Sequence, residues 1–226
     1  LTFVPLVEGI ATEFTSIKTF ILMCNEDEMP ETSLPGALCY ETLLAVEEPG
    51  FAWPDFDENT ASSLCYTSGT TGNPKGVLYS HRSTVLHTLC ALGAETLAIR
   101  NRDCMLAIVP MFHANCWGTP YACAAAGAKV VYPGPFMDGD KLHALIEAEG
   151  VTIALGVPTV WLGLINYMKA TNTRIDTVRR TVIGGTAIPE SMLRTLEEDY
   201  GVEVLHAWGM TETSPLGSVG TLRAGE

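Results

Sequence analysis

Short runs of apolar residues alternate with segments of helical periodicity from residue 64 onward, and this alternation constrains the fold more than any other feature of the chain. The runs have the length of buried strands, and the segments between them are long enough for helices. Such alternation is typical of parallel β-α-β units, so we expect an α/β fold with a largely parallel sheet. The expected strands lie at 64–66, 104–109, 129–132, 151–157, 181–183 and 202–205, and the last of these is expected to be the final strand.

Helix signals fill the gaps between the expected strands. Ser80 is a capping residue, and Val85, Leu89 and Leu92 fall on one face of the helix that would follow it. Further helices are expected at 117–126, from 138 or 140 to 149, from 158 onward and at 189–200. The first sixty residues are less regular and rich in acidic residues and proline. We therefore interpret 1–60 as a connecting and acidic region and 61–226 as an α/β core.

Composition excludes several classes of function. The net charge of −13 argues against a nucleic-acid partner, because such binding depends on clustered Lys and Arg. Seven scattered cysteines without a Cys-x-x-Cys pair indicate neither a zinc site nor a disulfide framework. The sequence contains no stretch of about 18 uncharged apolar residues, the pattern that would indicate a transmembrane segment. A cytoplasmic location is the default expectation, and the sequence leaves open whether the chain forms a homodimer.

The densest motif is a glycine-rich run at 66–76, Tyr-Thr-Ser-Gly-Thr-Thr-Gly-Asn-Pro-Lys-Gly. Glycine permits backbone shapes in which successive N–H groups converge on one anion, and the hydroxyls and Lys75 add donors and a positive charge. The run is not a Walker A motif, because no Gly-Lys-Ser/Thr follows, and it lacks Gly-x-Gly-x-x-Gly. A solvated surface loop is the alternative, but so dense a run with a lysine favours a polyphosphate.

All the candidate motifs follow the carboxyl ends of expected strands. These motifs are the glycine-rich run, the turn at His113, Gly184-Gly185 and the stretch from His206. In open α/β sheets this edge is where ligands bind, so we expect one shared site.

These motifs lie in three stretches that, in this order, resemble the motifs of the adenylate-forming superfamily. This superfamily includes acyl-CoA synthetases, luciferases and peptide-synthetase adenylation domains. The stretches are 66–76, 110–117, and 184–187 together with 206–215. The resemblance covers nearly the whole chain. It implies layered, largely parallel β-sheets flanked by helices, as part of the N-terminal domain of such an enzyme.

The resemblance also implies a function, that of a fatty acyl-CoA synthetase. Such an acid–thiol ligase activates a medium- or long-chain fatty acid with ATP to an acyl-adenylate, and then forms a thioester with CoA. The cofactors and partners implied are ATP, Mg²⁺, CoA and the fatty acid. The resemblance implies that residues 1–226 are a partial AMP-binding N-terminal domain. The ribose-binding aspartate and the C-terminal domain with its lysine are absent from the chain, so we expect it to be incomplete for turnover.

By resemblance, the glycine-rich run holds the phosphates, and Lys75 steadies the β- and γ-phosphates. Glu212 suits Mg²⁺, and Thr211 offers a hydroxyl to the α-phosphate. Trp208 occupies the position of an aromatic that stacks on adenine, although a core tryptophan is the alternative. The remaining nucleotide-binding candidates are Thr67, Ser68, Gly69, Thr70, Thr71, Gly72, Gly185, Thr186, Ala187, His206, Ala207, Gly209 and Met210. His206 departs from the Gln or Asn-like residue often found there.

The acyl group is assigned by the same resemblance. His113 matches a histidine near the acyl carboxylate and the α-phosphate, and Trp117 matches an indole that gates the acyl tunnel of fatty acyl-CoA synthetases. Gly184 and Gly185 would lie along the acyl group. The catalytic candidates are therefore Thr67, Lys75, His113, Thr211 and Glu212.

Three alternatives stay open at the level of sequence. The first is a ligase for a short acid such as a methylthio-propionate, built on the same Trp117 pattern. The second is a nucleotide-binding relative without turnover, although intact Lys75, Thr211 and Glu212 argue against degeneration. The third, an NTP hydrolase, is disfavoured because no Walker A motif and no water-activating base accompany the run.

Overall fold

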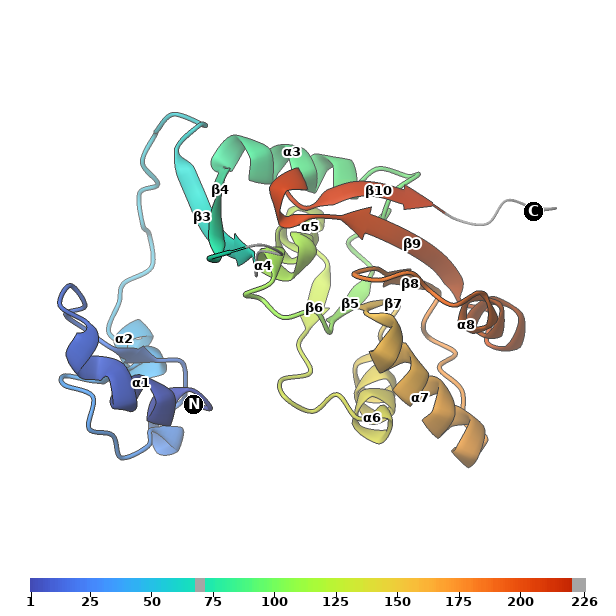
Figure 1. The fold of residues 1–226 in the computed structure, drawn as a ribbon, viewed down its shortest axis with the longest axis horizontal. Helices are drawn as coiled ribbons and strands as arrows, with labels where there is room; N and C mark the ends of the chain where they lie inside the picture. The colour runs from blue at the N-terminus through green and yellow to red at the C-terminus, as the bar shows by residue number, and fades with distance from the viewer. Residues whose placement is uncertain (68–71, 221–226) are drawn as a thin grey trace. The chain divides into compact units, whose positions relative to one another are not determined.

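A computed structural model describes residues 1–67 and 72–220 of the chain (Figure 1). Four candidates from the glycine-rich run, Ser68, Gly69, Thr70 and Thr71, lie outside the described residues. The chain divides into two compact units, Leu1–Asp55 and Phe56–Glu226.

The first unit is small and built around a two-stranded parallel sheet. Strand β1 (Ile21–Leu22) pairs with β2 (Leu38–Cys39), and its buried core consists of Leu22, Cys24 and Cys39. The helices of this unit are α1 (Val4–Ile10), η1 (Ala11–Glu13), η2 (Glu26–Glu28) and α2 (Tyr40–Ala45).

The second unit contains a six-stranded sheet in the order β10-β9-β8-β7-β5-β6. Every neighbouring pair is parallel except β10 with β9, which is antiparallel. The expected α/β fold with a largely parallel sheet is confirmed. The strands are β5 (Cys104–Ala107), β6 (Lys129–Val131), β7 (Ile153–Gly156), β8 (Arg180–Ile183), β9 (Glu203–Gly209) and β10 (Leu216–Gly220).

Helices cover both faces of this sheet, as Figure 1 shows. The helices are α3 (His81–Ala91), α4 (Ala114–Trp117), α5 (Thr119–Ala126), α6 (Gly139–Glu149), α7 (Pro158–Thr171) and α8 (Glu190–Arg194). The π-helical segment η3 (Thr195–Asp199) continues α8, and η4 (Thr211–Thr213) is a short 3₁₀ turn. Because successive strand side chains point to opposite faces, Leu106 packs with the residues of α6, α7 and α8, while Met105 packs with those of α3 and α5. The sheet is therefore the middle layer between two helical layers.

Two features of the strands differ from expectation. The run at 64–66 is not part of the main sheet: β3 (Ala61–Thr67) pairs antiparallel with β4 (Lys75–Ser80) in a separate hairpin. A parallel strand buried on both faces is apolar throughout, whereas β3 buries only Cys65. In addition, 202–205 is not the final strand, because β10 follows it.

Helix α3 also buries a different face from the one its aliphatic residues indicate. Ser80 caps it as expected, by accepting a hydrogen bond from the Ser83 N–H at 3.1 Å. Val85 and Leu89, however, are 55% and 60% exposed, and the buried residues are His87, Thr88 and Ala91. Apolar residues occur on several sides of this helix, so periodicity alone does not identify the face that packs on the sheet.

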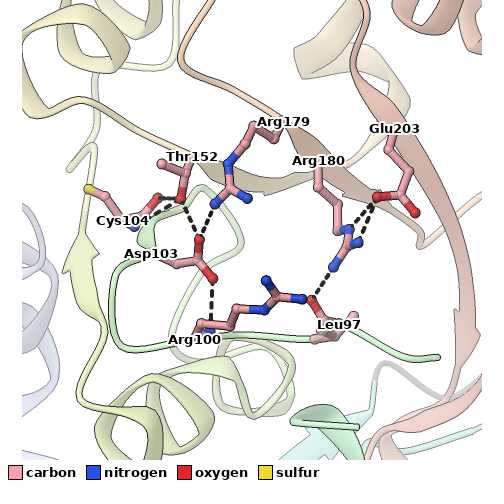
Figure 2. Close-up of polar contacts among 8 residues, drawn as sticks. All are labelled: Leu97, Arg100, Asp103, Cys104, Thr152, Arg179, Arg180 and Glu203. Carbon is pink, nitrogen blue, oxygen red and sulfur yellow. Dashed lines mark hydrogen bonds and ion pairs between the residues drawn. The ribbon is translucent and has the colours of Figure 1, made fainter. Parts of the chain in front are cut away.

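A polar cluster occupies the amino ends of the strands, opposite the edge that carries the motifs (Figure 2). Its centre is Asp103, whose side chain is 2% exposed and forms an ion pair with Arg179. The carboxylate also accepts hydrogen bonds from the Arg100 N–H at 2.8 Å and from the Thr152 hydroxyl at 3.0 Å. The cluster thus joins the segments that lead into β5, β7 and β8.

Candidate functional site

A cavity of about 510 Å³ opens at the carboxyl ends of the strands in the second unit. Parallel strands bring the turns that follow them to one edge, and here the hairpin β3–β4 contributes from the side. All five catalytic candidates lie in its wall: Thr67, Lys75, His113, Thr211 and Glu212.

The nucleotide candidates divide into those that line this cavity and those that do not. Gly185, Ala207, Trp208, Gly209 and Met210 line it. The structure does not bring four others to its wall, and all four are exposed: Gly72, Thr186, Ala187 and His206. Their roles stay predictions.

Trp208 is not a core tryptophan. It lies near the end of β9, is 56% exposed and contributes to the cavity wall. Its ring covers Gly217 of the neighbouring β10 so closely that a Cβ atom at Gly217 would overlap the indole. An exposed indole face of this kind suits stacking on a flat ligand.

A left-handed turn that follows His113 carries Trp117 to the cavity wall. Ala114, Asn115, Cys116 and Trp117 have φ values of 47°, 53°, 52° and 55°, a region that non-glycine residues rarely adopt. Side chains hold the turn in place: the Asn115 amide donates to the Ser63 hydroxyl of β3 at 2.7 Å. Backbone strain of this kind clusters at functional sites, and here it coincides with a cavity wall.

Small residues permit close approach around Trp117. A Cβ atom at Gly184 would lie 3.3 Å from the Trp117 indole and 2.8 Å from the Ala207 carbonyl oxygen. The indole therefore packs against Gly184, which directly follows β8.

Sequence reasoning missed several cavity residues. His87 is one of them: it lies inside α3, is 9% exposed, and its Nε2 has no hydrogen-bond partner among the described residues. Burial lowers the pKa of His87, which keeps the ring neutral at neutral pH. No signal marks a histidine within a helix as part of a site. The other missed residues are Leu97, Ala114, Thr119, Leu155, Val182, Pro215 and Leu216.

The carboxylate of Glu212 faces the cavity from η4. It is exposed, and no hydrogen bond or ion pair joins it to another side chain in residues 1–67 and 72–220. The same residues contain no group of three or more His, Cys, Asp or Glu side chains that could hold a metal. A single carboxylate nevertheless fits Mg²⁺, which binds through one or two carboxylates together with substrate phosphates.

The fold and this cavity define the chain as an α/β domain with a candidate ligand site at the carboxyl ends of its strands. The chain belongs to the AMP-binding enzyme family, whose model matches residues 20–225. Within the described residues, no helix is long and apolar enough to cross a membrane.

Known proteins similar to the chain include several CoA ligases. It is 51% identical to the medium-chain-fatty-acid–CoA ligase of Ectopseudomonas oleovorans, over 97% of the chain and 40% of that protein. It is 52% identical to the 3-methylmercaptopropionyl-CoA ligase of Ruegeria pomeroyi, over 96% of the chain and 40% of that protein. The crystal structure of the anthranilate CoA ligase AuaEII shares the fold with a TM-score of 0.84 at 22% identity, over 99% of the chain and 43% of AuaEII. The chain thus spans about 40% of the length of the curated relatives it matches.

Proposed function

We propose that the chain is the nucleotide- and acyl-binding part of a fatty acyl-CoA synthetase. The whole protein would convert a fatty acid and ATP to an acyl-adenylate and pyrophosphate, and then form a CoA thioester with release of AMP. The observation that carries this proposal is one cavity whose wall combines a group of polar residues with a group of apolar residues. Similarity to a medium-chain ligase supports the choice of acid.

We call the part of the wall formed by Thr67, Lys75, Thr211 and Glu212 the polar end, and it suits a nucleoside triphosphate. Thr67 and Lys75 reach it from the hairpin, and Thr211 and Glu212 reach it from η4. The attack of a carboxylate on the α-phosphate requires no protein nucleophile; it requires in-line positioning and stabilisation of the developing negative charge. Lys75 would supply positive charge, and the Thr211 hydroxyl would donate a hydrogen bond. Mg²⁺, held by Glu212 and the phosphates, would neutralise further charge.

The apolar part of the wall suits an acyl chain. Trp117 and Leu216 pack against the core that contains Leu97, Leu155 and Val182, and all five residues line the cavity. Each CH₂ group buried against such a wall contributes about 0.8 kcal/mol of transfer free energy. Affinity should therefore rise with chain length until the space is full.

A second candidate substrate is a short acid with a thioether. The chain is as similar to the Ruegeria methylmercaptopropionyl-CoA ligase as to the medium-chain ligase. The two acids use the same chemistry and differ in the apolar surface they bury. Rates with acids of graded length would therefore distinguish them, because a flat profile contradicts the fatty-acyl assignment.

The remaining assignments also belong to this proposal. Residues 61–226 would be the nucleotide- and acyl-binding core of a partial AMP-binding domain, and 1–60 a connecting region. CoA would be the second substrate, and the protein would act in the cytoplasm. Sedimentation would decide whether the protein forms a homodimer.

The test of the proposal is Lys75→Ala in a protein of full family length that contains this chain. Adenylation, measured by pyrophosphate exchange, should slow strongly, because Lys75 would contact only the β- and γ-phosphates. Binding of a non-hydrolysable acyl-adenylate analogue, which lacks those phosphates, should change little. Arg82→Ala, which removes an exposed charge paired with Glu58, is the matched control. Equal weakening of both ligands by Lys75→Ala would contradict the assignment.

A further inference from the structure

Tyr79 links the two segments that form the polar end of the cavity. It lies near the end of β4, is 5% exposed and takes no part in the cavity wall. Its hydroxyl donates to the backbone carbonyl oxygen of Thr211 at 2.6 Å, across 132 positions of sequence. Because β4 begins at Lys75 and Thr211 precedes Glu212, this one hydrogen bond connects the strand of the lysine with the turn of the carboxylate.

The other hydrogen bonds of this turn are local. The Thr213 N–H donates to Met210 O at 3.0 Å, and the Met210 N–H donates to Pro215 O at 3.1 Å. The Ser214 N–H reaches the Thr211 carbonyl oxygen only at 3.4 Å. Local bonds fix the shape of a turn, and β9 and β10 fix its place on the main sheet. Strand β3 of the separate hairpin also contacts the turn, and among the described residues the hydrogen bond from Tyr79 joins the turn to β4.

The chemistry of Tyr79 suits a permanent tether. Burial raises the pKa of Tyr79 to about 12, and the charges of Cys65 and Glu212 add to this effect. The hydroxyl therefore stays protonated at neutral pH and remains a donor. A buried donor and acceptor that satisfy each other are costly to separate, because neither finds water in place of its partner.

We propose that Tyr79 is a positioning residue that sets the separation of Lys75 and Glu212 across the polar end of the cavity. The role of those two residues rests on the proposed function; the tether itself rests on the contact between Tyr79 and Thr211. Tyr79 touches no substrate and acts through the turn that carries Glu212.

The test uses Tyr79→Phe, which removes the hydroxyl and keeps the ring. In the full-length protein, the Mg²⁺ concentration for half-maximal adenylation should rise about five- to tenfold, the range expected for one buried hydrogen bond. Amide exchange over 209–215 in the ligand-free protein should quicken by a similar factor, since the turn loses its hydrogen bond to β4. This second measurement requires neither metal nor turnover.

Thr181→Val is the matched control. The Thr181 hydroxyl donates to the Ala154 carbonyl oxygen at 3.1 Å and is fully buried, but it lies within the main sheet and is not one of the residues that line the cavity. Both variants are assayed well below their unfolding transitions. The proposal holds if Tyr79→Phe alone changes the exchange of 209–215 and the Mg²⁺ dependence. It fails if neither quantity moves, or if both variants change them equally. A wild-type protein without adenylation would contradict the proposed function, and the exchange measurement would still decide the tether.

Discussion

Replacing Asp103 by Asn should destabilise the second unit far more than its small change in shape suggests. The carboxylate is 2% exposed and accepts from the Arg100 N–H and the Thr152 hydroxyl while pairing with Arg179 (Figure 2). An asparagine keeps one acceptor oxygen and places an NH₂ group where the other oxygen was. The new NH₂ group is a donor, and it then faces either the Arg100 N–H or the Arg179 guanidinium, each of which is also a donor.

The magnitude follows from the groups involved. A hydrogen bond to a charged group contributes about 1.5–3 kcal/mol, and a buried donor left without a partner costs about 1–3 kcal/mol. Arg179 is 54% exposed, so water recovers part of its loss. We therefore expect Asp103→Asn to lower the free energy of unfolding by about 2–3 kcal/mol.

Glu203→Gln is the control for this prediction. Glu203 pairs with Arg180 in the same cluster, but its side chain is 46% exposed. Exposed ion pairs contribute about 0–1 kcal/mol, so this variant should unfold close to wild type. Urea unfolding of the chain, followed by circular dichroism and fluorescence, compares the two. Equal losses would refute the reasoning that burial, and not the presence of an ion pair, sets the cost.

Three further predictions concern the cavity edge. Glu212→Gln should strongly reduce adenylation while leaving the melting temperature nearly unchanged, because the carboxylate is exposed and unpaired among the described residues; unchanged Mg²⁺ dependence would contradict its role. Trp117→Ala should change the dependence of rate on acyl chain length and leave ATP binding intact; a uniform loss of stability alone would indicate a structural role. Since the pKa of Tyr79 rises from 10.0 to about 12 in the fold, wild-type stability should fall as the pH rises through this interval. Tyr79→Phe should lose this part of the alkaline dependence in a urea titration at each pH.

The sequence predicts the parallel core well because a strand that is buried on both faces is recognisable as an apolar run. The segments β5, β7 and β8 are apolar runs between helices, and all three were expected within a few residues of their ends. β10 contains Gly217 and Gly220 and only two aliphatic residues, so the sequence shows no apolar run there. Its pairing with β9 depends on tertiary contacts.

The site was predictable where residue type reports chemistry. Lys75 and Glu212 were expected together and line one cavity. His87 was not expected, because its burial depends on the packing of α3. Tyr79 was not expected either, because its only sign of importance is a hydrogen bond across 132 positions.

The left-handed turn at 114–117 has a consequence for how the proposed preference for one acid could change by mutation. Natural selection and directed evolution both change a protein by substitution. At most positions in a cavity wall, the size of the new side chain decides whether a substitution is tolerated. At the wall positions Ala114 and Trp117 the backbone imposes a second restriction, since positive φ disfavours valine, isoleucine and threonine and favours glycine and asparagine. Variation in the proposed acid preference should therefore accumulate at Leu97 and Leu155, where the backbone imposes no such restriction.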